Sequence, residues 1–227
     1  MLAGGGVVFL LDVDNTLLDN DRFGADLGAR LERLFGAAER DRYWAIYAEL
    51  RDTLGYADYL AALQRFRVGL EDAPELLQMS EFLLEYPFAE RLYPHALAAI
   101  RHLQTLGTPA VLSDGDVVFQ PRKIQRSGIA SAVEGRVLIY LHKERMLTAV
   151  KRRLPAAHYV MVDDKPGLLA AMKRQLGAEL TTIFVRQGHY AVESVGGVID
   201  PAPDLSLERI GDLLSCDLSN LIERGAA

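Results

Sequence analysis

Two hydrophobic patterns divide this chain. Between Phe23 and Phe88, apolar residues recur at helical spacing and no strand-like run interrupts them. Outside that stretch, helical segments alternate with short apolar runs, first Val7 to Leu11 and then runs near residues 109, 137, 159 and 181. Such alternation is typical of an α/β fold in which crossover helices join the strands of a parallel sheet.

The uninterrupted helical stretch is interpreted as an insertion between the first and second strands. We expect a core of 1–19 and 91–227 and an insertion of 20–90, with linkers at Asp19-Asn20 and between Pro87 and Pro94. Inserted at this place, the helices would act as a cap over the end of the sheet.

Polar residues follow four of the apolar runs at the point where each run stops. Asp12 and Asp14 come after the first run, two positions apart, so an extended backbone directs both side chains to the same side. The next runs are followed by Ser113, by Lys143 and by Asp163-Asp164. Ligands dock at the carboxyl ends of strands in doubly wound sheets. Carboxylate pairs, a hydroxyl and an ammonium are the groups that metal-assisted phosphoryl transfer requires.

Each of these groups also has a local interpretation. The stretch Asp12 to Thr16 could cap a helix, because Asp, Asn and Thr all favour that position. Lys143 could be an ordinary exposed lysine, and Asp163-Asp164 a solvated helix start. Their order after successive strands favours a shared site instead.

This ordered set resembles the haloacid dehalogenase-like (HAD) superfamily of hydrolases, in its phosphatase-type members with a helical cap between the first and second motifs. The first signature is at Asp12 to Thr16, the second at Ser113, the third at Lys143 and the fourth at Asp163-Asp164. The resemblance covers nearly the whole chain and implies a Rossmann-like parallel-sheet core with an α-helical cap. Two positions depart from the pattern. Glu144 follows the lysine where many members have proline, and Leu168 stands where many carry a further acidic residue.

The resemblance also implies a role for each residue. Asp12 is expected to be the nucleophile, Asp14 the general acid and base, oriented by Thr16, and Lys143 the group that neutralises charge on Asp12 and the phosphoryl group. The residues expected to bind the phosphoryl group are Thr16, Ser113, Asp114, Gly115 and Lys143. Mg²⁺ is the favoured cofactor, because carboxylate and carbonyl oxygens suit a hard cation. Its expected ligands are Asp12, Asp163, Asp164 and the backbone carbonyl of Asp14.

Composition agrees with a cytoplasmic enzyme that acts on a small phosphorylated substrate. The chain has 227 residues and a net charge of -6, and no basic stretch is dense enough to predict nucleic-acid binding. Cys216 is the only cysteine, which excludes an intramolecular disulfide and fits a reducing compartment. The first apolar run is short and is cut by Asp12, so neither a signal peptide nor a membrane span is expected.

The expected activity is hydrolysis of a phosphomonoester through an aspartyl-phosphate intermediate. A sugar phosphomutase, a 2-haloacid dehalogenase of the same superfamily and a non-catalytic phosphate-binding scaffold are the alternatives. Asp14 favours phosphate chemistry over dehalogenation, which needs no acid at that position.

Three further interpretations concern segments outside these motifs. Lys123 and Arg126 are expected on the surface of the helix after Ser113. Leu205 to Leu218 is interpreted as a closing helix in which Cys216 packs. Gln187 to Tyr190 is placed near the rim of the site.

Overall fold

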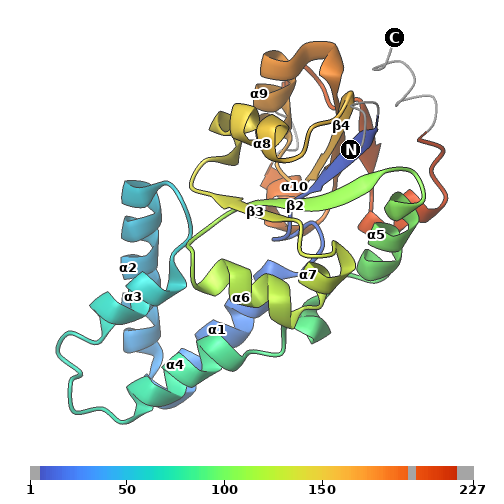
Figure 1. Cartoon of the computed structure of the whole chain (residues 1–227). Coiled ribbons are helices and arrows are strands. Elements are labelled where there is room, and N and C mark those ends of the chain that lie inside the picture. The colour runs from blue at the N-terminus through green and yellow to red at the C-terminus, as the bar shows by residue number, and fades with distance from the viewer. Residues whose placement is uncertain (1–5, 194–197, 219–227) are drawn as a thin grey trace.

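A six-stranded parallel sheet forms the centre of the larger lobe in the computed structural model, which describes residues 6–193 and 198–218 (Figure 1). Within these residues its strands lie in the order β3-β2-β1-β4-β5-β6. Their bounds are Val7–Leu11 (β1), Thr108–Asp114 (β2), Val137–Tyr140 (β3), His158–Asp163 (β4), Leu180–Val185 (β5) and Leu205–Leu207 (β6). Leu11 pairs with Val111 of β2 and Val162 of β4, so these strands end together at one edge.

Helices connect the strands and build the smaller lobe (Figure 1). Their bounds are Asn20–Phe35 (α1), Ala37–Leu54 (α2), Tyr59–Phe66 (α3), Glu75–Glu85 (α4), Ala96–Gln104 (α5), Phe119–Arg126 (α6), Ile129–Ala132 (α7), Leu147–Arg153 (α8), Pro166–Leu176 (α9) and Gly188–Glu193 (α10). Short 3₁₀ helices span Phe88–Arg91 (η1), Lys143–Arg145 (η2), Gly177–Glu179 (η3) and Ile210–Leu214 (η4). None of the described helices is long and apolar enough to cross a membrane.

Both faces of the sheet are covered, which explains why its strands are almost entirely apolar. Successive strand residues point to opposite faces, and β1 divides its side chains accordingly. Phe9 and Leu11 join an apolar cluster that includes residues of α5 and the inserted helices. Val8 and Leu10 join a second cluster with residues of α8 and α9.

The segment after β5 differs from its predicted structure. Leu205 to Leu218 was expected to be one helix, whereas Leu205–Leu207 forms the edge strand β6 and the 3₁₀ helix η4 follows. Asp204 accounts for the strand, because its carboxylate accepts hydrogen bonds from the Thr182 backbone nitrogen and hydroxyl at 2.8 and 2.9 Å. This contact holds the chain beside β5, so tertiary pairing overrides a helical apolar pattern. Cys216 lies after η4 and packs against the core.

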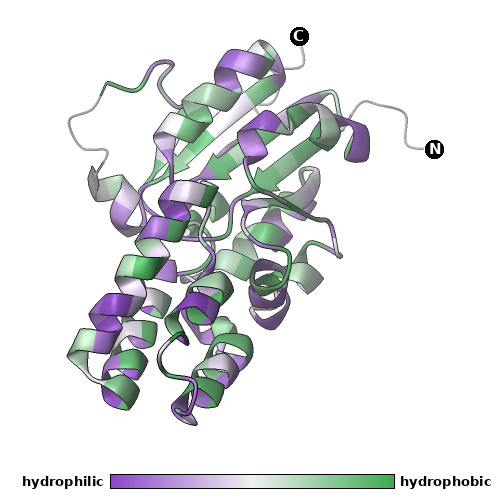
Figure 2. Cartoon of the chain, turned by 90° about the vertical axis from the view of Figure 1, so that its left-hand side faces the viewer, coloured by the Kyte–Doolittle hydropathy of each residue, from purple (hydrophilic) through white to green (hydrophobic). Residues whose placement is uncertain are grey.

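Four helices, α1 to α4, form the smaller lobe after β1. Each carries both hydrophobic and hydrophilic segments (Figure 2), and buried apolar residues from all four join one core cluster. Phe23 of α1 is fully buried, and its ring centroid lies 5.1 Å from that of Tyr59 of α3. It also lies 5.6 Å from the ring of Phe119 in α6. The aromatic packing is therefore continuous between the inserted helices and the core. Within the stretch of helical spacing from Phe23 to Phe88, Leu70 lies in the connection between α3 and α4.

Two linkers join the inserted helices to the core, and they run side by side. The Asp19 backbone nitrogen donates to the Arg91 carbonyl at 2.7 Å, and the Tyr93 nitrogen donates to the Leu17 carbonyl at 3.0 Å. The Asp19 side chain caps α1 by accepting from the Arg22 nitrogen at 2.8 Å. The helices thus begin directly at the loop that follows β1.

Candidate active site

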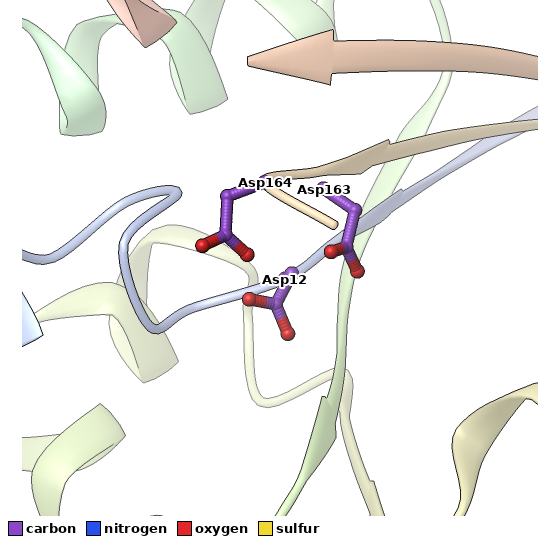
Figure 3. Close-up of side chains that lie close together, drawn as sticks. All are labelled: Asp12, Asp163 and Asp164. Atoms are coloured by element: carbon purple, nitrogen blue, oxygen red, sulfur yellow. The ribbon is translucent and has the colours of Figure 1, made fainter. Parts of the chain in front are cut away.

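Three buried carboxylates converge at the carboxyl edge of the sheet. Asp12 follows β1, Asp163 ends β4 and Asp164 is the next residue, and their side chains lie close together in Figure 3. One oxygen from each lies within 4.8 Å of the others, and all three residues are buried. The sheet order explains this convergence, because β1 and β4 are paired neighbours that end at the same level.

Lys143 brings an ammonium into this cluster from η2, beyond β3. Its side chain is buried, and its Nζ contacts an oxygen of Asp12 and lies 2.7 Å from Asp163 Oδ2. Asp114 helps to hold this segment, since its Oδ1 accepts a hydrogen bond from the Lys143 backbone nitrogen at 2.7 Å. Burial alone lowers the pKa of Lys143, but the charges of Asp12 and Asp163 outweigh it and raise the pKa above its ordinary value.

Asp164 is the member of the cluster that most needs a further partner. Both of its carboxylate oxygens are buried and accept no hydrogen bond from the residues that the structure describes. Burial, followed by the charges of Asp163 and Asp12, raises the pKa of Asp164 to about 9. Burial likewise raises the pKa of Asp12 to about 7, against the opposing charge of Lys143. Unpartnered carboxylate oxygens in this setting require a proton or a cation, and oxygen ligands suit a hard cation.

Lys165, which follows Asp164, is a second cation beside the cluster. Burial lowers its pKa, but the charges of Asp12 and Asp163 outweigh burial and raise it above the ordinary value. The ring of Tyr190 lies 4.9 Å from the Lys165 ammonium. Leu168, at the position where an acidic residue is common, packs against the apolar cluster beneath the sheet and not among the carboxylates.

Asp14 lies outside the carboxylate cluster and has its own partners. Its Oδ1 accepts from the Lys123 ammonium at 2.7 Å, and its Oδ2 accepts from Gln120 Nε2 at 3.2 Å. The Asp14 side chain is 28% exposed, whereas the Lys123 side chain has no exposed surface. The prediction that Lys123 is a surface residue of α6 is therefore wrong. Arg126, on the same helix, is exposed as predicted and bonds to Glu85.

The orientation of Asp14 by Thr16 is also not as predicted. Thr16 is fully buried, and its hydroxyl makes no hydrogen bond within residues 6–193 and 198–218. The Thr16 backbone carbonyl accepts a hydrogen bond from Gln187 Nε2 at 3.2 Å. Gln120 and Lys123 hold Asp14 instead.

The segment after β2 places Ser113 and Gly115 beside Gln120. Ser113 is buried, and its hydroxyl donates to the Asp114 carbonyl at 3.3 Å and accepts from Gln120 Nε2 at 3.0 Å. Gly115 has a φ of +154°, and a Cβ there would lie 2.9 Å from the Gln120 Cβ. This close approach requires glycine. Binding of a phosphoryl group by Thr16, Ser113, Asp114, Gly115 and Lys143 stays a prediction.

The segment from Gln187 to Tyr190 ties the core to the first inserted helix. His189 Nδ1 lies 2.6 Å from Asp21 Oδ1, and its backbone nitrogen donates to Asp21 Oδ2 at 2.8 Å. Asn15 joins this contact by donating to Asp21 Oδ1 at 3.0 Å. These bonds fix the start of α1 against the loop that carries Asp12 and Asp14.

Gln120, Lys123 and Lys165 are the site residues that sequence reasoning missed. Gln120 and Lys123 are three positions apart and therefore share one face of α6. That face follows directly after the predicted Ser113 loop, which was the available signal. Lys165 adjoins the predicted carboxylate pair.

Comparisons with known proteins agree with this geometry. Residues 7–174, well over half of the chain, match the family model described as "haloacid dehalogenase-like hydrolase". The chain is 58% identical to a haloacid dehalogenase-like hydrolase from Burkholderia xenovorans LB400, with a TM-score of 0.87 over 94% of this chain and 99% of that one. The comparison with curated proteins gives no match.

Two more distant solved structures share the fold. A HAD hydrolase from Bacillus subtilis bound to magnesium is 16% identical, with a TM-score of 0.61 over 93% of this chain and 98% of that one. An L-2-haloacid dehalogenase from Xanthobacter autotrophicus is 19% identical, with a TM-score of 0.58 over 91% and 96%. The family model and the 58% identical structure decide the assignment, and this chain belongs to the haloacid dehalogenase-like hydrolases.

Proposed function

We propose that this protein is a magnesium-dependent phosphomonoesterase that acts on a small phosphorylated metabolite through an aspartyl-phosphate intermediate. The observation that carries the proposal is the presence of two carboxylates, close in the sequence, that lie in different surroundings. Asp12 lies in a buried cluster that calls for a cation, and Asp14 lies two residues away, bound to Lys123 and partly exposed. A nucleophile and a separate acid are what a two-step phosphoryl transfer uses.

In the first step, a carboxylate oxygen of Asp12 attacks the phosphorus atom and the bond from phosphorus to the alcohol oxygen breaks. Asp14 enters this step protonated, gives its proton to the departing oxygen and becomes the carboxylate that pairs with Lys123, so the alcohol leaves neutral. In the second step, Asp14 takes a proton from a water molecule that attacks the phosphoaspartate. Inorganic phosphate leaves, and both carboxylates return to their starting state. Lys143 balances the charge of Asp12, and Ser113 donates to a phosphoryl oxygen.

The residues present fit a magnesium ion. Asp12, Asp163 and Asp164 would hold it, because they supply buried oxygens and those of Asp164 accept no hydrogen bond in the described part of the chain. When bound, the ion would offset negative charge on the phosphoryl group. The backbone carbonyl of Asp14 stays a predicted further ligand.

Asp14 also separates this proposal from dehalogenation, since displacement of a halide leaves no oxygen to protonate. A phosphomutase would use the same groups and would return the phosphoryl group to a sugar in place of water. The two activities therefore differ in their product.

The test is phosphate release from a panel of phosphorylated metabolites, with and without magnesium, alongside 2-chloropropionate. We expect magnesium-dependent release by the wild type. We expect Asp12→Asn to fold and to lose several orders of magnitude of turnover, because it removes the covalent nucleophile. Asp52→Asn, on the exposed face of α2, is the matched control and should retain wild-type turnover.

Two results would overturn the proposal. The first is equal, metal-free phosphate release by the wild type and Asp12→Asn. The second is chloride release from 2-chloropropionate with no activity on any phosphate ester, which would establish dehalogenation. Transfer of phosphate between two positions of a sugar without its release would indicate a phosphomutase.

A further inference from the structure

We infer that Lys123 is a positioning residue that fixes the carboxylate of Asp14 and links its placement to the seating of the inserted helices. The inference deepens the proposed function and rests on it, because Asp14 is there the acid and base. The observation behind it is a fully buried ammonium that bridges Asp14 of the core loop and Asn20 at the start of α1.

The polar contacts of Lys123 hold the Asp14 carboxylate at a defined place. The Lys123 ammonium lies 2.7 Å from Asp14 Oδ1 and 3.0 Å from Asn20 Oδ1. Gln120, one helical turn earlier on α6, donates to Asp14 Oδ2 at 3.2 Å and to the Ser113 hydroxyl at 3.0 Å. Each oxygen of Asp14 therefore has a donor on α6, and the same helix reaches the predicted phosphate-binding hydroxyl.

Aromatic rings enclose the rest of the Lys123 head group. The ring centroids of Phe23, Tyr59 and Phe88 each lie 5.9 Å from the ammonium, and that of Phe119 lies at 5.4 Å. Such distances are within the range of cation–π attraction. A lysine is kept in surroundings of this kind only when a counter-charge is at hand, and Asp14 supplies it. Rotation of Asp14 away from Lys123 would leave a buried cation unpaired, which opposes that rotation.

Half of this environment belongs to the inserted helices. Asn20 begins α1, Phe23 lies in α1 and Tyr59 begins α3. Asn20 is itself held there, since its Nδ2 donates to the Tyr59 hydroxyl at 3.3 Å. Displacement of the inserted helices would remove Asn20 and two of the rings from Lys123. The seating of these helices and the position of the Asp14 carboxylate are thus coupled through one side chain.

This coupling predicts a dependence on the leaving group. An alkyl alcohol is a poor leaving group and needs the proton of Asp14, whereas 4-nitrophenolate leaves readily without one. Misplacement of Asp14 should therefore slow the first step for alkyl phosphates and spare it for aryl phosphates. General loss of structure or of metal would slow both alike.

The experiment measures alcohol release in a single turnover, with enzyme in excess, for 4-nitrophenyl phosphate and for the best alkyl phosphate of the panel. The variants are Lys123→Met, Asp14→Asn and the double variant; methionine is chosen because its flexible apolar chain suits the aromatic surroundings. Because a general acid is worth about 10²–10⁴-fold, we expect Lys123→Met to slow alkyl release by about 100-fold and aryl release by less than about 3-fold. The double variant should be no slower than Asp14→Asn, since Lys123 acts through Asp14.

Arg126→Met is the matched control on the same helix. Arg126 also joins α6 to the inserted helices, through Glu85 Oε2 at 2.7 Å and the Tyr86 carbonyl at 3.2 Å, and these contacts do not include Asp14. We expect it to change alkyl and aryl release by the same factor. If Arg126→Met shows the leaving-group dependence of Lys123→Met, or if the effects of Lys123→Met and Asp14→Asn multiply, the inference is refuted.

A second readout separates this inference from the proposed function. The same three variants and the wild type are unfolded in urea, and the interaction between positions 14 and 123 is read from the double-mutant cycle. Failure of the wild type to release phosphate from every ester would refute the proposed function and the role of Lys123 in leaving-group protonation. A cycle without interaction would refute the structural link itself, whatever the activity.

Discussion

The buried carboxylate of Asp164 predicts that the stability of the protein depends on both pH and magnesium. Burial and neighbouring charges raise the pKa of Asp164 from 3.8 to about 9 in the folded protein. Between these values the folded chain holds a proton that the unfolded chain releases. The stability that this bound proton contributes is fully present below about pH 4 and is lost as the pH rises through about 9.

The magnitude follows from the linkage of one proton to unfolding. The free energy of unfolding should fall by about 1.4 kcal/mol for each pH unit in this window. From about pH 6 to about pH 8 the fall is about 3 kcal/mol, which lowers the Tm of a chain of this size by about 6–11 °C. Asp164→Asn removes the titration of this residue. Its contribution is therefore the free energy of unfolding of the wild type minus that of the variant at each pH.

The assay is thermal unfolding followed by circular dichroism, first in EDTA and then in excess magnesium. Magnesium requires the ionised carboxylate and so competes with the proton. The rise in Tm on adding magnesium should therefore grow with pH in the wild type and be much smaller in Asp164→Asn. In EDTA, a difference in Tm between the wild type and Asp164→Asn that stays constant from about pH 6 to about pH 8 would contradict the raised pKa of Asp164. An equal rise with magnesium in both would contradict a metal site at Asp164.

Two further predictions concern stability. Lys143→Met leaves the carboxylates of Asp12 and Asp163 buried without their cation, so urea unfolding in EDTA should show a loss of about 3–5 kcal/mol; a loss below about 1 kcal/mol would mean that other groups pair them. Phe23→Ala removes a fully buried ring that packs on both lobes, and should lower the free energy of unfolding by about 3–5 kcal/mol. Leu77→Ala, at a side chain that is 77% exposed, is its control and should change stability by less than about 0.5 kcal/mol; comparable losses for the two would contradict the packing.

The fold and the carboxylate cluster could be predicted from the sequence because both depend on local patterns. Apolar runs that stop at polar residues mark strand ends, and a parallel sheet brings those ends to one edge. Asp12, Asp163 and Asp164 therefore had to be close if β1 and β4 were neighbours, as they are. Similar reasoning brought Lys143 to the same edge, and its Nζ does contact Asp12.

The residues that were missed depend on packing between segments that no local pattern connects. Lys123 is polar and lies on a short helix, so its sequence context resembles that of a surface residue. Its burial results from Phe23 and Tyr59, which reach it only after the inserted helices fold back against α6. The strand β6 has a similar origin, because Asp204 binds Thr182 across the sheet edge. Contacts of this kind appear only in three dimensions.

Asp12 and Asp14 are two residues apart, yet the fold pairs them with different lysines. Asp12 is buried and shares Lys143 with Asp163, whereas Asp14 is partly exposed and is paired with Lys123. The two lysines come from different segments, η2 beyond β3 and helix α6 beyond β2. Each carboxylate can therefore change its charge without breaking the ion pair of the other. A reaction in which one carboxylate attacks while its neighbour gives and then takes a proton requires this independence, because the two must hold different protonation states at the same moment.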